Sequence, residues 1–293
     1  MTATRLYNIP MPQVLSIQSS VAYGFAGNSA ACFTLRRGGI ETWPVYTVHF
    51  SNHTGYGDWR GPVLDPSQVS DVVRGIDERG ILGEVDAVLS GYQGAPTMGQ
   101  AILDAVTLVR SRNPEAIYCC DPVMGDVDRG FYAAAGIPEF MRDRVTAEAT
   151  VMTPNLFELE YLTDTHTSSL DDVITAAEAL RARGPRIVLV TSAIGIGADD
   201  QVMRMIAQDS TQTWQVTTPL LDRKFTGSGD LTTAVFLTQL LNGAELPVAL
   251  SHTASAVYSI LARTDELGRD ELALVQAQAD IVDPVHRFET NKL

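Results

Sequence analysis

The chain has 293 residues, of which 45% are hydrophobic and 19% charged, and its formal net charge is −14 at pH 7. This length and composition are typical of a soluble protein with one large α/β domain or two small ones. The acidic balance argues against a nucleic-acid-binding protein, which needs a basic face, and equally disfavours docking on anionic lipid.

The cysteines and the apolar runs bear on where the protein works. Cys32, Cys119 and Cys120 are odd in number, and two of them are adjacent in a strand-like run. This pattern favours reduced core thiols over a disulfide framework. No basic-then-apolar leader opens the chain, and no run of about 18 apolar residues occurs. We therefore expect a cytosolic protein.

Strands and helices alternate through the first 120 residues. Met1–Pro12 carries two prolines and little pattern, and we expect it to be a loose arm. The strands that hydrophobic patterning predicts here are Gln13–Gln18, Thr42–Val48, Val85–Leu89 and Ala116–Cys120. The helices predicted between them are Asn28–Arg37, Asp65–Glu78 and Thr97–Arg112. Phe50–Gly57 is polar, aromatic and punctuated by glycine, as loops are.

The second half of the chain continues the alternation. Val151–Thr153 precede Pro154-Asn155 and a short helix that holds Glu158 and Glu160. Further on, patterning predicts a helix over Leu170–Arg183 and a buried strand over Ile187–Val190. It also predicts a hairpin made of Val202–Ile206 and Thr213–Val216. Three helices are expected between Leu231 and Asp280, broken at Asn242-Gly243 and at Thr264–Gly268.

Alternating strands and helices predict an α/β fold with a mostly parallel sheet covered by helices on both faces. No repeat or convincing linker divides the chain, so we expect a single domain over residues 1–293. Ligands of such sheets bind at the carboxyl ends of the strands. The polar residues that fall at those ends are Ser19, Asn52–Thr54, Tyr92, Asp121, Thr153 and Glu158.

A glycine-rich stretch, Thr226-Gly227-Ser228-Gly229-Asp230, precedes the first of the last three helices. With no Cβ at Gly227 and Gly229, successive backbone N–H groups can turn toward one point. The helix start adds unpaired N–H groups and a positive dipole end, which together make an anion site. Asp230 lies at the mouth of this site, where it can take a proton from a hydroxyl. The alternative is a glycine-rich turn capped by Ser228 or Asp230.

Several familiar chemistries are excluded by simple pattern matching. The sequence has no Gly-Lys dipeptide and hence no ordinary Walker A loop. Thr232 replaces the third glycine of a dinucleotide fingerprint, and Thr226 and Asp230 replace the glycines of a hydrolase nucleophile elbow. No cysteines or histidines have zinc spacing. Lys224 is the only internal lysine near the loop, which disfavours a pyridoxal-phosphate-dependent enzyme.

The motifs together resemble the pyridoxal kinases of the ribokinase-like superfamily, over roughly Val14 to Leu293. The segments that carry the resemblance are Ile17–Ser19, Gly24–Asn28, Val48–Tyr56, Leu89–Tyr92, Asp121–Gly125, Thr153–Glu158 and Thr226–Asp230. The strings FSNHTGY and SGY separate these enzymes from sugar kinases of the same fold. The resemblance implies ATP-dependent phosphorylation of the 5′-hydroxymethyl group of pyridoxal, and of pyridoxine and pyridoxamine. It also implies a homodimer.

The resemblance assigns roles on the vitamer side. Ser19 and Thr54 match residues that hydrogen-bond the ring nitrogen and phenolic oxygen, with Gly55 in the same loop. Val48 and Tyr92 match residues that sandwich the pyridine ring. Asp230 matches the base, and Gly227, Ser228 and Gly229 match the backbone that holds the terminal phosphate. His53 either contacts substrate or braces its own loop.

On the nucleotide side, Asp121, Thr153 and Glu158 match residues around Mg²⁺ and an accompanying monovalent cation. The resemblance places Thr191 and Ser192 at the nucleotide, and some relatives have a lysine where this chain has Thr191. The segment beside adenine contains Thr218, Pro219, Leu220 and Leu221. Lys224 is the remaining candidate for neutralising the triphosphate.

Two other functions remain open at this point. One is a kinase of the same fold that acts on a hydroxymethylpyrimidine or on a mixture of vitamers. The other is a protein that binds pyridoxal without turnover, which the presence of Asp230 disfavours.

Overall fold

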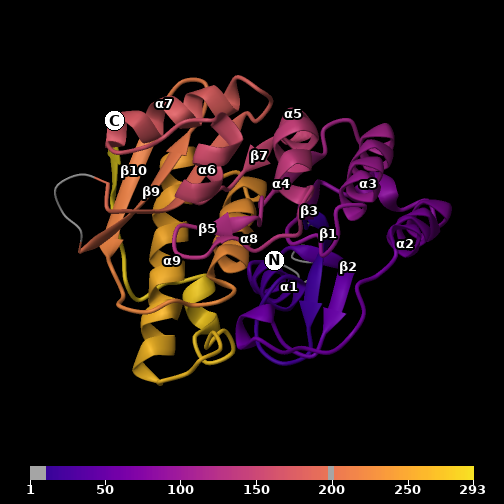
Figure 1. Cartoon of the computed structure of the whole chain (residues 1–293), viewed down its shortest axis with the longest axis horizontal. Helices are drawn as coiled ribbons and strands as arrows, with labels where there is room; N and C mark the ends of the chain where they lie inside the picture. The colour runs from indigo at the N-terminus through magenta and orange to yellow at the C-terminus, as the bar shows by residue number, and fades with distance from the viewer. Residues whose placement is uncertain (1–10, 197–200) are drawn as a thin grey trace, which may run out of the picture.

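The structure, a computed structural model, describes residues 11–196 and 201–293 (Figure 1). Most of the arm predicted over Met1–Pro12 therefore lies outside the described residues. Within them, nine strands form one sheet in the order β11-β10-β9-β8-β7-β4-β3-β1-β2. The bounds are β1 Gln13–Val21, β2 Glu41–Phe50, β3 Ala87–Ser90, β4 Ile117–Cys120, β7 Val151–Met152, β8 Ile187–Ile194, β9 Val202–Gln208, β10 Thr213–Pro219 and β11 Thr290–Lys292.

The strands from β2 to β8 run parallel, and β9, β10 and β11 continue the sheet in antiparallel pairing. The parallel part is buried on both faces, as βαβ units require. Successive residues of β1 show this, since Val14 belongs to the core on one face and Leu15 to the core on the other. The predicted mostly parallel sheet is confirmed.

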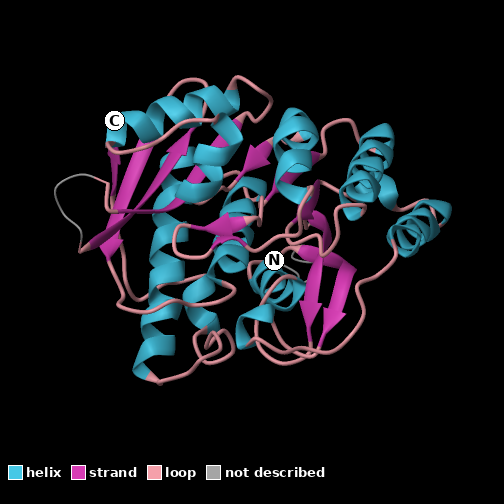
Figure 2. Ribbon diagram, in the orientation of Figure 1, coloured by secondary structure: helices cyan, strands magenta, loops and turns pink. Residues whose placement is uncertain are grey.

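Helices cover both faces of the sheet (Figure 2). One face packs against α1 (Asn28–Arg37), α8 (Ser228–Leu241) and α9 (Leu246–Glu266). The other packs against α2 (Pro66–Glu78), α3 (Met98–Arg112), α6 (Leu156–Thr163) and α7 (Leu170–Arg181). The smaller elements are the hairpin β5 (Gly125–Asp126) and β6 (Gly130–Phe131), the helical turns α4 (Ile137–Phe140), Met141–Val145 and α5 (Thr146–Glu148), and the 3₁₀ turns Thr54–Tyr56, Leu82–Glu84 and Gln278–Ile281.

Local sequence signals fix several helix starts. Asp65 caps α2 by accepting a hydrogen bond from Ser67 N at 2.9 Å, and Pro66 occupies the first helical position. Asn155 and Glu158 form a reciprocal capping box at the start of α6. This box matters for the site because it fixes the carboxylate of Glu158 at the carboxyl end of β7.

The prediction of a third helix between Leu231 and Asp280 is wrong. The chain leaves α9 after Glu266, and Gly268 has a φ of 59°. From there to the 3₁₀ turn at Gln278 the chain forms no helix. Every residue from Glu271 to Leu274 is buried, which a helix with one solvent face does not allow.

Other boundaries also differ from expectation. Helix α8 begins at Ser228 rather than Leu231, so the glycine loop enters the helix itself. Strand β8 runs on from Val190 to Ile194, and Thr191 and Ser192 lie inside it rather than after it. Strand β11 was not predicted and pairs with β10 at the sheet edge. The predicted hairpin is confirmed as β9 and β10.

Candidate active site

The glycine loop enters α8 without a side-chain cap. Gly227 has a φ of 88° and occupies the N-cap position, and the helix start has no side-chain capping hydrogen bond. A Cβ on Gly227 would lie 1.9 Å from the carbonyl oxygen of Phe25, so only glycine fits. The alternative of a turn capped by Ser228 or Asp230 is therefore contradicted. The N–H of Ser228 donates to Phe225 O at 3.2 Å, and the N–H groups of Gly229 and Asp230 behind it point out of the helix start, where an anion can bind.

Asp230 turns toward the loop after β1 instead of capping its own helix. Its Oδ2 accepts a hydrogen bond from Gly27 N at 2.8 Å, across the interior of the site. Burial raises the pKa of Asp230 to about 6, and the hydrogen bond from Gly27 opposes this rise. A carboxylate with such a pKa is ionised near neutral pH and basic enough to accept a proton.

Gly27 also lies against Ser19, and it therefore links Ser19 to Asp230. Its φ is 56°, and a Cβ there would lie 2.2 Å from Ser19 Oγ. Ser19 is buried at the end of β1, with Gly27 bridged to its neighbour Ser20. The predicted vitamer residue and the predicted base thus flank one glycine, although 203 positions separate Gly27 from Asp230.

Two further carboxylates lie next to Asp230. Burial, followed by the charges of Glu158 and Asp230, raises the pKa of Asp121 well above its ordinary value. Burial likewise raises the pKa of Glu158 to about 7, against hydrogen bonds from backbone N–H groups. Glu158 accepts them from Met124 N at 2.8 Å and Asn155 N at 3.0 Å. A cation beside this acidic group would relieve the repulsion.

Helix α8 supplies a second polar side chain to this group. The hydroxyl of Thr233 lies 2.7 Å from that of Thr153, at the end of β7, and Thr233 also hydrogen-bonds Asp121. Thr233 was missed from sequence. The signal was available, because residues three apart on a helix share a face and Asp230 was already a candidate.

The predicted ring walls belong to one small cluster. Val48 is fully buried with Val21, Ala26 and Phe50, and the half-buried Tyr92 packs against this group. The backbone oxygen of Tyr92 accepts a hydrogen bond of 2.7 Å from Thr47 Oγ1, which ties the loop after β3 to β2.

Thr54 and Gly55 form an exposed 3₁₀ turn beside the glycine loop. A Cβ on Gly55 would lie 3.6 Å from Thr226 Oγ1. His53 accepts a hydrogen bond from Gly55 N at 3.2 Å and so braces the turn. This contact gives His53 the bracing role, one of the two roles considered for it.

Thr191 and Ser192, the residues predicted to contact the nucleotide, sit at a bulge in β8, where the register shifts between Val190 and Ala193. Ser192 has a φ of 48°, a strained conformation that often marks functional sites. Thr191 N donates to Pro154 O at 2.9 Å, so the bulge adjoins the loop that follows Thr153.

The segment predicted to lie beside adenine ends β10. Thr218 pairs with Met203 of β9, which in turn pairs with Ile194 of β8, so these strand ends share one edge of the sheet. Pro219 is exposed there, and Leu220 and Leu221 are partly exposed. The structure thus places this segment near the bulge of β8.

Lys224 forms an ion pair with Asp128 at the tip of the β5–β6 hairpin, and both side chains are 65% exposed. Asp128 was missed from sequence. Asp126 of the same hairpin pairs with Arg129 at 2.6 Å.

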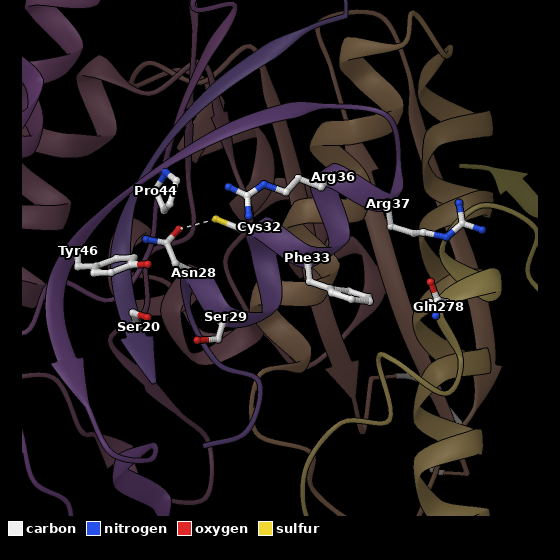
Figure 3. A pocket seen from close by; sticks show the side chains of 10 residues that line it. All are labelled: Ser20, Asn28, Ser29, Cys32, Phe33, Arg36, Arg37, Pro44, Tyr46 and Gln278. Carbon is white, nitrogen blue, oxygen red and sulfur yellow. Dashed lines mark hydrogen bonds between the residues drawn. The ribbon is translucent and has the colours of Figure 1, made fainter. Parts of the chain in front are cut away.

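A hollow lies beside α1. Figure 3 shows its lining, which includes Asn28, Phe33, Arg36, Tyr46 and Gln278. Asn28 donates to three backbone oxygens of β1 and β2, and Arg36 donates to Thr42 O at 2.9 Å. These polar groups hold the fold together, and none of the predicted site residues lines this hollow.

Comparison with known proteins agrees with the geometry. Residues 94–274 match the family model described as phosphomethylpyrimidine kinase. Curated pyridoxal kinases of Rubrobacter xylanophilus and Leifsonia xyli are 53% and 48% identical over 281 residues, which is 96% of this chain and 97% and 99% of those proteins. The solved pyridoxal kinase of Leishmania donovani in complex with ADP and pyridoxine is 26% identical, with a TM-score of 0.89, and the match covers 96% of this chain and 99% of that one.

Proposed function

Because the chain belongs to the pyridoxal kinase family, we propose that it transfers the γ-phosphoryl group of ATP to the 5′-hydroxymethyl group of pyridoxal, and also of pyridoxine and pyridoxamine. The predicted family, ribokinase-like fold and enzyme class are confirmed by these relatives. The observation that carries the assignment of residues is the contact between Asp230 and Gly27, since it joins the glycine loop to the vitamer side.

The proposed step uses groups already in place. The hydroxymethyl group points at Asp230 and at the γ-phosphorus, and Asp230 accepts its proton as the oxygen attacks. The phosphorus–oxygen bond to ADP breaks as the new bond forms. The backbone N–H groups of Gly227, Ser228 and Gly229 hold the transferred phosphoryl group, and that of Ser228 gives up its 3.2 Å hydrogen bond to Phe225 O to do so.

The donor set fits a hard cation held partly through water. Asp121, Glu158 and Thr153 supply oxygen atoms, and the carboxylates repel one another without a cation. Within residues 11–196 and 201–293, no three histidine, cysteine or acidic side chains are arranged to hold a metal alone. This suits Mg²⁺ that is bound mainly by phosphate and water. When bound, it would neutralise phosphate charge, and a monovalent cation is part of the same proposal.

The nucleotide assignments follow the same edge of the sheet. Thr191 and Ser192 would contact the phosphates or ribose from the bulge of β8, and Thr218 to Leu221 would border adenine. Lys224 would leave Asp128 and neutralise the triphosphate. The high exposure of Lys224 supports this change of partner from Asp128 to the triphosphate, because an exposed ion pair costs little free energy to break.

A hydroxymethylpyrimidine kinase is the second candidate, favoured by the name of the family model. The match begins at residue 94, so it leaves out Ser19, Val48, Thr54 and Tyr92, which are the residues proposed to select the ring. A coupled assay with both ring types separates the two. Product from pyridoxal, dependent on MgATP, supports the proposal, and product from the pyrimidine alone would replace it. Absence of turnover with either would leave a binding protein.

The assembly and location are proposed on the resemblance. We expect a homodimer, which light scattering of the purified protein would test. We also expect the enzyme to be located in the cytosol. In the described part of the chain, no helix has the length and apolar character to cross a membrane.

A further inference from the structure

Glu271 is a buried carboxylate on which three loop donors converge. It is 4% exposed and lies in the segment after α9 that was wrongly predicted as helix. Its Oε2 accepts from Phe25 N at 3.0 Å, and its Oε1 accepts from Tyr56 Oη at 2.8 Å and lies 3.1 Å from His53 Nε2. No step of the proposed reaction uses this group.

The hydrogen bonds of His53 fix its tautomer. Its Nδ1 accepts from Gly55 N at 3.2 Å and therefore carries no hydrogen. A neutral ring then bears its hydrogen on Nε2, which donates to Glu271. The ring also stacks on Tyr56, with 4.5 Å between centroids. Glu271 thus holds His53, the residue before the turn, and Tyr56, its last residue, on either side of Thr54 and Gly55.

The segment beneath Glu271 is firmly packed. Leu272, Ala273 and Leu274 are buried, and Ala273 N donates to Thr264 Oγ1 at 2.9 Å. A Cβ on Gly227 would lie 3.3 Å from Leu272 Cδ1. The same segment therefore supports the glycine loop through Leu272 and the Thr54 turn through Glu271.

We propose that Glu271 is a positioning residue that holds His53–Tyr56 in the conformation that presents Thr54 and Gly55 beside the glycine loop. The inference rests on the proposed function, because it assigns Thr54 to the vitamer. Glu271 is expected to set the affinity for pyridoxal, while the nucleotide end of the site is independent of it.

Charge and geometry both require a carboxylate here. Burial alone would raise the pKa of Glu271, but hydrogen bonds from His53, Tyr56 and Phe25 outweigh it and lower the pKa. All three partners are donors. A glutamine would turn an NH₂ group toward at least one of them, so Glu271→Gln cannot preserve the arrangement despite its equal size.

The first test compares Michaelis constants. Glu271→Gln should raise KM for pyridoxal about tenfold, the scale of one lost hydrogen bond to a charged group, with KM for ATP nearly unchanged. Glu266→Gln is the matched control, because its carboxylate is exposed at the end of α9 and pairs only with Arg263 among the contacts described. Tyr56→Phe should raise KM for pyridoxal less in the Glu271→Gln background than in the parent, because the two residues act through one contact.

The second test needs no turnover. Hydrogen–deuterium exchange of the peptide over residues 52–57 should be faster in Glu271→Gln than in the parent and in Glu266→Gln. If the parent phosphorylates no pyridoxal, the proposed function fails, but the exchange rates still test the brace. Unchanged exchange and an unchanged KM for pyridoxal would overturn the inference. A lower melting temperature with the exchange rate and KM for pyridoxal unchanged would show that Glu271 only stabilises the fold, and this result would also overturn the inference.

Discussion

Gly27 shows at the scale of one residue why the site depends on backbone as much as on side chains. Its N–H holds Asp230, and the absence of a Cβ leaves room for Ser19. Motifs identified Ser19 and Asp230 separately. They could not show that one glycine joins them, because this contact links segments at opposite ends of the sequence.

The pKa of Asp230 predicts a pH dependence. Burial raises it to about 6, so the carboxyl is protonated below that pH and cannot accept a proton. We expect kcat/KM for pyridoxal to fall by about tenfold per pH unit as the pH drops below this value. A pH profile at saturating MgATP measures it. A flat profile between pH 7 and pH 5 would contradict a base with this pKa, those limits being about one unit either side of it.

Tyr92→Ala should weaken pyridoxal binding more than it slows transfer. An aromatic wall contributes on the order of 1–3 kcal/mol per stacked ring, so KM should rise at least fivefold or so. Tyr92→Phe is the matched control, since it keeps the ring. An unchanged KM in the alanine variant would remove Tyr92 from the ring site.

Asp121→Ala should raise the Mg²⁺ concentration needed for half-maximal rate and leave pyridoxal affinity nearly intact. The same is expected of Glu158→Ala, with an added loss of stability, because Met124 N and Asn155 N lose a buried acceptor. Glu160→Ala is the control on the same helix, since its carboxylate turns to Thr167. Superimposable magnesium titrations for Asp121→Ala and the parent would mean that this carboxylate is structural.

At the scale of elements, helix and strand positions were predicted best where local signals are strong. The starts of α1 and α2 follow from glycine, aspartate and proline signals and were predicted correctly. The segment after α9 was not, because its apolar residues Leu272 to Leu274 serve tertiary packing rather than a helical face. The extension of β8 through a bulge at Ser192 likewise depends on pairing with β9, which no local pattern encodes.

The ion pair between the β5–β6 hairpin and the segment before the glycine loop gives a prediction at this scale. Lys224→Met should raise KM for ATP about threefold, consistent with an exposed charge worth about 1 kcal/mol or less. Asp128→Asn, which frees Lys224, should leave KM for ATP unchanged or lower it. Equal KM and turnover in Lys224→Met and the parent would show that the lysine serves only the ion pair.

At the scale of the whole molecule, the parallel sheet explains why residues scattered from Ser19 to Asp230 meet. Their strands end at one edge, and that rule was enough to predict the grouping of Asp121, Thr153 and Glu158. The neighbours Thr233 and Glu271 needed the structure, because they come from a helix face and from a packed coil. The net charge of −14 adds to the electrostatic cost of holding the acidic cluster without cations.

The central claim is that Asp230 is the base of a pyridoxal kinase within an intact fold. The direct measurement is single-turnover phosphorylation of pyridoxal by Asp230→Asn and by the parent, with the melting temperature taken on the same preparations. The account predicts a loss of turnover of about 10²–10⁴-fold, with little change in pyridoxal affinity or melting temperature, because the amide keeps the size of the side chain but cannot take the proton. Turnover within about threefold of the parent would contradict the claim, since a general base contributes far more than that.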